Sequence, residues 1–174
     1  MSYYETIYEY AADNYGIITS AQSKELEIPN IELVKLSHRN RLQRIWQGVY
    51  RISHYIPTHL DKYAEAVAIV GEGSYIYGES VLAMHGLALL NPAIIYVATI
   101  KRIRKTLPKY IKKINVKKVS QIEYHEGIPT QDIVSAIIVC RKQIMTERLI
   151  EAVEEAKEMG LISNEEKKYL KELL

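Results

Sequence analysis

The sequence predicts an α+β fold in two parts, and three observations support this prediction. Residues 1–60 contain short segments with helical spacing of apolar residues, followed by an alternating hairpin pattern. Residues 94–100 form a near-continuous apolar run, which is typical of a buried strand. With 174 residues, 48% of them apolar, the chain is long enough for two small cores. We therefore expect one domain over 1–60 and a mixed α/β domain over 61–174.

Two helices are expected near the start of the chain. Apolar residues recur at helical spacing over residues 2–14, and Gly16 is suited to a left-handed helix stop. Thr19 and Ser20 offer side-chain oxygens to the free backbone amides of a second helix, which runs roughly to residue 26. These segments are expected to be the first and second helices of the domain.

A third helix is expected to follow Pro29, which suits a first helical turn. Its apolar residues Ile31, Val34 and Leu36 are expected to face inward. The side chains expected to face outward are Asn30, Lys35, His38 and Arg39.

A short hairpin is predicted next. Asn40 tolerates the left-handed conformation that ends a helix, and residues 42–46 alternate apolar with polar side chains. Gln47-Gly48 is expected to turn the chain into a second strand over 49–52. Three short helices and a hairpin in this order predict a winged helix-turn-helix, whose third helix reads DNA.

The charges agree with a DNA-binding face in this domain. Between Lys35 and Arg51 there are five basic residues and no acid. A solvated surface helix is the alternative interpretation, although basic charge and fold pattern coincide here. The residues expected to contact DNA are Thr19, Ser20, Asn30, Lys35, His38, Arg39, Arg41, Arg44, Gln47 and Arg51.

The second domain is predicted to mix helices and strands. We first expect a helix over 61–70, a turn over 71–73, a strand over 74–77 and a helix over 79–85. A strand over 94–100 and a neighbouring strand over 116–124 follow. The last part is expected to be helical, with a helix capped by Thr130 that contains residues 133–144, a helix over 146–159 and a last helix from Ser163.

A second basic stretch lies in this domain. No acid occurs between Glu79 and Glu123, whereas nine basic residues lie between 101 and 118. They either solvate a strand connection, extend a DNA footprint or contact a protein partner, and the sequence leaves these alternatives open. The stretch consists of Lys101, Arg102, Arg104, Lys105, Lys109, Lys112, Lys113, Lys117 and Lys118.

Enzymatic chemistry is not expected. Cys140 lies in an apolar segment and is interpreted as a core residue, and His85 is interpreted as a helix C-terminal residue. His54 and His59 lack a nearby third ligand, and no glycine-rich phosphate loop is present. We expect no catalytic residue, metal or cofactor. Without a signal sequence or an apolar run long enough for a bilayer, the protein is expected to be soluble and cytoplasmic.

Two groups of motifs resemble a known family. Tyr15-Gly-Ile-Ile-Thr-Ser-Ala-Gln22, Leu36 to Leu42 and Gly48-Val-Tyr-Arg51 resemble the N-terminal winged helix of the abortive-infection type E antitoxins. Ser74-Tyr-Ile-Tyr-Gly-Glu-Ser-Val-Leu-Ala-Met-His-Gly-Leu87 and Ile94-Ile-Tyr-Val-Ala98 are similar to the segment that joins this domain to the family's second domain. Val81 and Asn40 depart from the family pattern, which has alanine and glycine there.

This resemblance implies a transcriptional repressor and antitoxin of a type IV toxin-antitoxin system, active in phage defence. Such a protein would bind an inverted repeat upstream of its own operon as two copies, while being a monomer or weak dimer in solution. Its second domain would counteract a co-transcribed nucleotidyltransferase-like toxin. Two alternatives stay open: an orphan winged-helix regulator without a toxin, and a protein-interaction adaptor that never contacts DNA.

Overall fold

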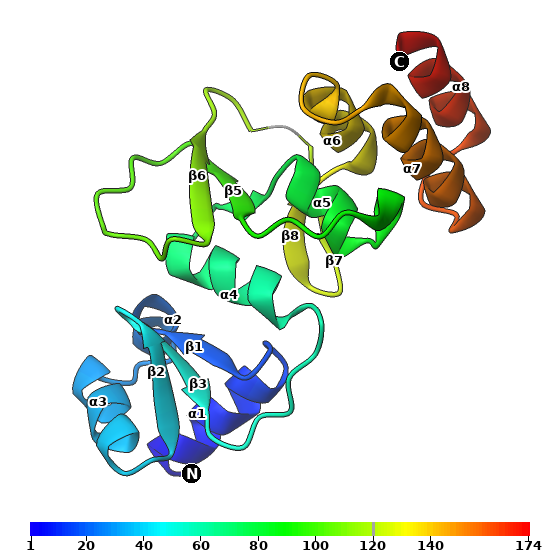
Figure 1. The fold of residues 1–174 in the computed structure, drawn as a ribbon. Coiled ribbons are helices and arrows are strands. Elements are labelled where there is room, and N and C mark those ends of the chain that lie inside the picture. Colours follow the sequence, from blue (N-terminus) through cyan, green and yellow to red (C-terminus); the bar gives the residue numbers. More distant parts are fainter. Residues whose placement is uncertain (120) are drawn as a thin grey trace. The chain divides into compact units, whose positions relative to one another are not determined.

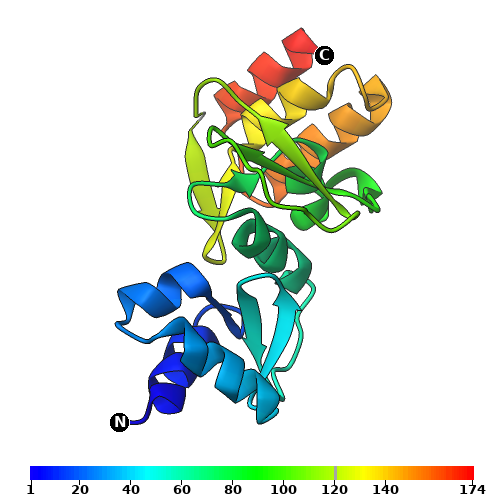
Figure 2. The same cartoon turned by 90° about the vertical axis from the view of Figure 1, so that its left-hand side faces the viewer.

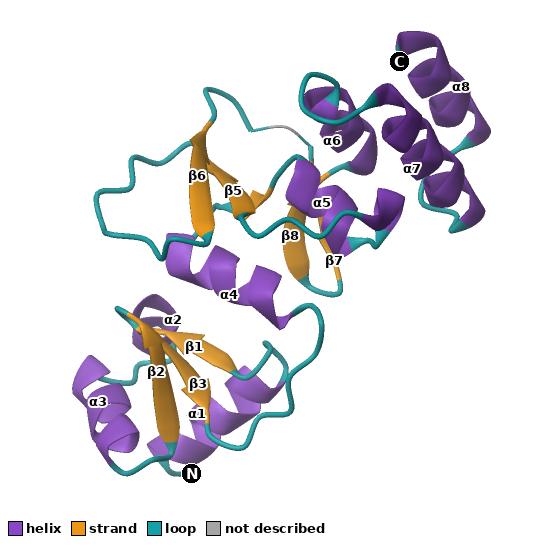
Figure 3. Cartoon of the chain, viewed as in Figure 1, coloured by secondary structure: helices purple, strands orange, loops and turns teal. Residues whose placement is uncertain are grey.

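The computed structural model describes residues 1–119 and 121–174 and divides into two compact units, Met1–Gly71 and Glu72–Leu174 (Figure 1). Both units contain helices and a sheet, which confirms the predicted α+β class (Figure 3). The division falls later than the expected boundary after residue 60, because the helix Asp61–Val70 belongs to the first unit by its contacts.

The first unit begins with three helices: α1 (Tyr3–Ala12), α2 (Ser20–Glu25) and α3 (Asn30–His38). The capping residues explain where α1 and α2 start. The Ser2 side chain accepts a hydrogen bond from the backbone amide of Glu5, and the Thr19 hydroxyl accepts one from that of Gln22. The predicted cap at Thr19 is thus confirmed. Figure 2 shows these helices gathered beside the hairpin strands.

A three-stranded antiparallel sheet completes this part of the unit. Strands β2 (Leu42–Trp46) and β3 (Val49–Ile52) form the predicted hairpin, with a bulge between Arg44 and Trp46. A further strand, β1 (Ile17–Thr19), pairs with β3 and gives the order β1-β3-β2. The sequence analysis missed β1, because three residues are too few to show an alternating pattern.

The core of the first unit corrects the expectation for α3. Leu33 and Leu36 are buried, whereas Ile31 and Val34 are 55% and 38% exposed. Pro29 is the N-cap residue, so the helix begins one residue after it. Leu33 and Leu36, one turn apart, form the inward face, and the second apolar pair of the helix lies on the opposite side. The buried cluster consists of Ile7, Ala11, Ile18, Ile28, Leu33, Leu36, Leu42, Tyr50 and Ile52.

Helix α4 (Asp61–Val70) closes the first unit through polar contacts with the end of the hairpin. The Asp61 carboxylate accepts hydrogen bonds from the hydroxyls of Tyr55 (3.2 Å) and Thr58 (2.9 Å). Gly16 is packed against the Tyr55 ring so closely that a Cβ at Gly16 would lie 2.7 Å from Cδ2 of that ring. These contacts hold the segment after β3 against the start of β1.

The second unit is built on a five-stranded sheet in the order β6-β5-β4-β8-β7 (Figure 3). The β5–β6 and β4–β8 pairs are parallel, and the β4–β5 and β7–β8 pairs are antiparallel. The strands are β4 (Tyr75–Ile76), β5 (Ile95–Thr99), β6 (Ile111–Asn115), β7 (Ile122–His125) and β8 (Ile128–Gln131).

One expected strand of this sheet is wrong in its bounds. The neighbour of β5 is β6, which begins at Ile111 inside the lysine-rich stretch, instead of a strand over 116–124. Strand β7 begins only at Ile122 and pairs with β8. Residue 120, within the expected strand, lies outside the described residues. Two adjacent lysines, Lys112 and Lys113, concealed β6, because lysine is depleted in strands.

Five helical segments accompany this sheet: α5 (Glu79–Met84), η1 (Leu87–Leu89), α6 (Ile133–Cys140), α7 (Thr146–Glu158) and α8 (Asn164–Leu173). Helices α6, α7 and α8 pack against one another (Figure 1). The cap of α6 is Asp132, whose carboxylate accepts from the Ser135 amide at 2.8 Å, and not the expected Thr130, which ends up buried in β8.

Two further findings concern the chain's apolar segments. Cys140 is fully buried in α6, as its apolar neighbours predicted. Among the described residues, no helix combines the length and the apolar character that a membrane crossing requires.

Candidate nucleic-acid interface

Helix α3 presents a continuous exposed stripe along its length. Five side chains at helical spacing share it, and they are mostly uncharged. Leu33 and Leu36 anchor the opposite face in the core, so the helix cannot turn this stripe inward without losing its packing. The stripe consists of Asn30, Ile31, Val34, Lys35 and His38.

Two exposed arginines lie at the end of α3 and on the strand that contacts it. Arg39 is the C-cap residue of α3, and Arg44 lies on β2, the strand that contacts α3. Both side chains are exposed, and neither has an ion-pair or hydrogen-bond partner among the described residues. The Arg41 guanidinium is also exposed but lies over the Tyr4 ring, with 5.2 Å from Cζ to the ring centroid. That stacking fixes its position and leaves its charge available.

Lys35 contributes less positive charge than its place on the stripe indicates. Its ammonium group lies 2.8 Å from a carboxylate oxygen of Glu32, one turn earlier. The pair is partly exposed and therefore weak, but it neutralises the only lysine of the stripe. The α3 surface is thus apolar and amide-bearing, with cations at one end and on the adjacent strand.

The start of α2 and the hairpin turn lie together. The Ser20 backbone amide donates to the Gly48 carbonyl at 2.9 Å, which places Ser20 and the exposed Gln47 side by side. Thr19, also expected to contact DNA, uses its hydroxyl and its amide in the capping box with Gln22. Its structural role is therefore clear, whereas Ser20 and Gln47 stay available at the surface.

The structure places Arg51 away from the expected surface. Its Nη1 lies 3.2 Å from a Glu65 carboxylate oxygen, and its guanidinium lies 5.6 Å from the centroid of the Tyr55 ring. The side chain is only 18% exposed, and Nε and Nη2 are buried without a hydrogen-bond partner among the described residues. Arg51 therefore joins β3 to α4. The sequence could not show this, because the partner lies on another element.

The second basic stretch occupies the connection that follows β5, edge strand β6 and the segment directly after β6. Lys101 pairs with Glu72 at 3.3 Å, with both side chains largely exposed. Arg102, Arg104, Lys105 and Lys109 are exposed in the connection. None of these four has an acidic partner within the described part of the chain, so the connection keeps a dense positive charge.

Two lysines of β6 have identifiable local roles. The Lys113 ammonium donates to the Ile103 carbonyl at 3.2 Å and so ties the connection to the strand. The Lys112 ammonium lies 5.9 Å from the centroid of the Tyr96 ring on the neighbouring strand. Because β6 is an edge strand, these charges also oppose pairing with another chain.

Among the described residues of the second unit, large pKa shifts are found for His85 and Cys140. Burial and, second, the proximity of His125 lower the pKa of His85 to about 4, and the two rings lie 4.1 Å apart between centroids. Burial also raises the pKa of Cys140 to about 12, with a smaller contribution from Glu79. The described residues contain no group of three or more histidine, cysteine or acidic side chains placed to hold a metal.

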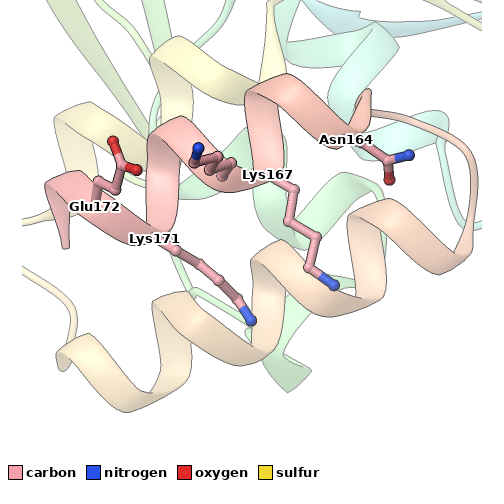
Figure 4. A pocket seen from close by; sticks show the side chains of 5 residues that line it. Asn164, Lys167, Lys171 and Glu172 are labelled. Carbon is pink, nitrogen blue, oxygen red and sulfur yellow. The ribbon is translucent and has the colours of Figure 1, made fainter.

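A shallow pocket lies along α8, lined by Asn164, Lys167, Lys168, Lys171 and Glu172 (Figure 4). Its positive charge is largely used within the protein. Lys167 and Lys171 both pair with the Glu154 carboxylate of α7 and lower its pKa through these hydrogen bonds. These ion pairs therefore stabilise the packing of α8 on α7, and they reduce the positive charge available to an anionic ligand.

Comparisons with known proteins add no family to this geometry. No family model matches the chain, and no curated protein is significantly similar to it.

Proposed function

We propose that the chain is a DNA-binding transcriptional repressor whose first unit is a winged helix-turn-helix. The observation that carries this proposal is the exposed stripe of α3 with the free arginines Arg39 and Arg44 beside it. The order of three helices and a β2–β3 hairpin supports it, because this order positions one helix for a major groove and a hairpin beside it.

In this proposal α3 enters the major groove and its basic neighbours contact the phosphates. Arg39, Arg41 and Arg44 bind the DNA backbone and set the orientation, while the exposed stripe faces the base edges. The hairpin turn at Gln47 approaches the neighbouring backbone together with Ser20. Two copies would occupy an inverted repeat upstream of the chain's own operon.

Salt-dependent binding tests this function. The full chain is titrated with its upstream DNA and with a shuffled duplex over a range of salt concentrations. Three phosphate contacts per copy and two copies predict a log-log slope of about −5. Arg39→Ala combined with Arg44→Ala removes two contacts per copy and is expected to reduce the slope to about −2, with little change in stability.

Arg141→Ala combined with Lys142→Ala is the matched control, because it removes the same charge from exposed positions of the second unit. This control is expected to bind as the unmodified chain does. A flat salt response, or equal effects of both double variants, would contradict the proposed DNA face. The adaptor alternative would then be favoured.

For the second unit we propose an antitoxin role directed at a nucleotidyltransferase-like toxin. The resemblance of residues 74–98 to the abortive-infection type E antitoxins supports this role, and the unpaired cations between residues 102 and 109 supply a surface for it. Nucleotidyltransferases act on polyanionic substrates, so a cationic surface can bind either such a substrate or an acidic part of the toxin.

Reversal of Lys101, Arg102, Arg104 and Lys105 to glutamate tests this role in the full chain. Cells that express the neighbouring toxin are scored for growth, and the chain's promoter is scored for repression. Loss of growth rescue with intact repression supports the antitoxin role. Lost repression with intact rescue would assign the connection to DNA, and intact function in both assays would leave the lysines with a purely solvating role. Glutamate reversal of Arg141 and Lys142 is the control.

A further inference from the structure

We infer that α3 recognises thymine methyl groups, so that the DNA bound by this protein is selected mainly at A·T base pairs. This inference rests on the proposed DNA-binding function and specifies which bases the stripe of α3 distinguishes. It starts from the unexpected exposure of Ile31 and Val34, which are 55% and 38% accessible on the stripe.

The two exposed apolar side chains of the stripe match one group of the major groove. Ile31 and Val34 lie one helical turn apart and have only hydrocarbon to offer a ligand. In the major groove the thymine C5-methyl is the apolar group that a base edge presents, and an apolar side chain is its matching contact. The guanine edge presents acceptors, which hydrocarbon cannot satisfy.

The polar residues of the stripe also favour A·T base pairs over G·C base pairs. Asn30 precedes Ile31 at the start of α3, and an asparagine amide matches the donor and acceptor pair of adenine. Lys35, the lysine that could reach guanine, is paired with Glu32 at 2.8 Å. The N-terminal residues of a groove-bound helix contact base edges, so Asn30, Ile31 and Val34 have the suitable positions.

The charges near the stripe favour DNA over an apolar protein surface as the partner of α3. Arg39 ends α3, and Arg44 lies on β2, the strand that contacts α3; both are exposed and without acidic partners among the described residues. An apolar strip with free cations beside it complements base edges flanked by phosphates. A protein partner would require acidic groups at the same places.

Substitution of thymine by deoxyuridine isolates the methyl group, because the two bases have the same hydrogen-bonding edges. The probe is the DNA duplex that the full chain binds most tightly after selection from a random-sequence pool. It is synthesised in two forms, with thymidine or with deoxyuridine at the positions that the bound protein covers. Burial of one methyl group corresponds to about a fourfold change in Kd. We expect the deoxyuridine duplex to bind about fourfold more weakly for each contacted methyl.

Ile31→Ala and Val34→Ala identify the side chains responsible. Each is expected to weaken binding of the thymine duplex and to leave binding of the deoxyuridine duplex nearly unchanged, as coupled partners do in a double-mutant cycle. Ile150→Ala is the matched control, because Ile150 of α7 is also 38% exposed but lies in the second unit. It is expected to change neither affinity.

The outcomes separate this inference from the function on which it rests. Equal affinity for both duplexes, with a steep salt dependence retained, overturns thymine recognition and leaves DNA binding in place. Variants that lose both duplexes equally also overturn it, since their effect would not depend on the methyl group. Absence of salt-dependent binding to any selected duplex contradicts the proposed function itself.

Discussion

The two units differ in how far along the chain their sheet partners lie. In the first unit the strands all come from residues 17–52, and every strand pair is antiparallel. In the second unit β4 pairs in parallel with β8, so that Ile76 lies opposite Thr130. The first unit is therefore specified by short-range patterns, whereas the second depends on contacts between distant segments.

The units also use their basic residues differently. In the first unit Arg51 and Lys35 are paired with acids, whereas Arg39 and Arg44 are exposed and free of such partners. In the second unit the basic connection is continuous with an edge strand, where Lys113 holds the connection and Lys112 lies over an aromatic ring. The structural role of a run of basic residues thus depends on whether these residues lie on a helix face or at a sheet edge.

Two intrinsic probes report on the units separately. The single tryptophan, Trp46, lies on β2, and the single cysteine, Cys140, is buried in α6. Leu33→Ala is expected to destabilise the first unit by about 3 kcal/mol, because a fully buried leucine is truncated. Denaturant unfolding followed by Trp46 fluorescence should show this loss, while Cys140 stays protected from thiol reagents.

Leu149→Ala is the mirror variant, since Leu149 of α7 is 1% exposed. It should expose Cys140 at lower denaturant and leave the Trp46 transition in place. If either variant shifts both probes equally, the units unfold as one cooperative body and the comparison between them fails.

Gly16→Ala is expected to cost about 2 kcal/mol in the first unit, through a left-handed backbone and a contact with the Tyr55 ring. Gly160→Ala is the control in the second unit. Gly160 has a similar φ of +73°, but nothing lies within 4 Å of its added Cβ. The control should therefore lose only the backbone contribution, about 1 kcal/mol. Equal losses would show that the Tyr55 ring moves aside freely.

The second unit is expected to lose stability in acid through His85. Its pKa falls from 6.5 to about 4 on folding, because burial and His125 disfavour the charged ring. The unfolded chain therefore binds more protons below pH 6.5, so the stabilisation is complete above that pH and is lost as the pH falls through about 4. After allowance for partial exposure, we expect a loss of about 2 kcal/mol.

The stability of the second unit is measured at each pH by the denaturant concentration at which Cys140 becomes accessible to a pyridyl disulfide. This reagent also reacts in acid. His85→Gln removes the titrating ring and should flatten the profile between these pH values. A profile identical to that of the unmodified chain would assign the acid sensitivity to other groups.

The smallest expected effect concerns the cap of α2. Thr19→Ala removes the hydroxyl that accepts from the Gln22 amide and should cost about 1 kcal/mol in the Trp46 transition. Thr19→Ser retains the hydroxyl and should restore most of the stability. If Thr19→Ala instead lowers DNA affinity at unchanged stability, Thr19 contacts DNA as the sequence first indicated.

Local signals explain which parts of the fold were predictable. The hairpin at 42–52 was found with its bounds, because strand alternation and the turn at Gln47-Gly48 occur within eleven adjacent residues. The bounds of β6 and the cap at Asp132 were missed. Strand β6 pairs in parallel with β5, so no tight turn marks its start, and its two adjacent lysines gave no strand signal.

The candidate site was predictable only in part for a similar reason. Arg39 and Arg44 could be expected to be exposed from their place after a helix and on a strand face. The pairing of Arg51 with Glu65 could not, because α4 had been assigned to the other domain. The exposure of Ile31 and Val34 was also missed. Like Leu33 and Leu36, they form an apolar pair at i, i+3 spacing, but on the opposite side of the helix, and spacing alone does not show which pair faces the core.

The parallel pairing of β4 with β8 has a consequence during synthesis of the chain. As the ribosome extends the polypeptide from its N-terminus, β1, β2 and β3 all find their partners once residue 52 has emerged. Strand β4 emerges soon afterwards, yet its neighbour β8 is still many codons away. The first unit can therefore be complete on the ribosome while Tyr75 and Ile76 still await half of their sheet, an interval in which a nascent-chain chaperone would find an unpaired apolar strand.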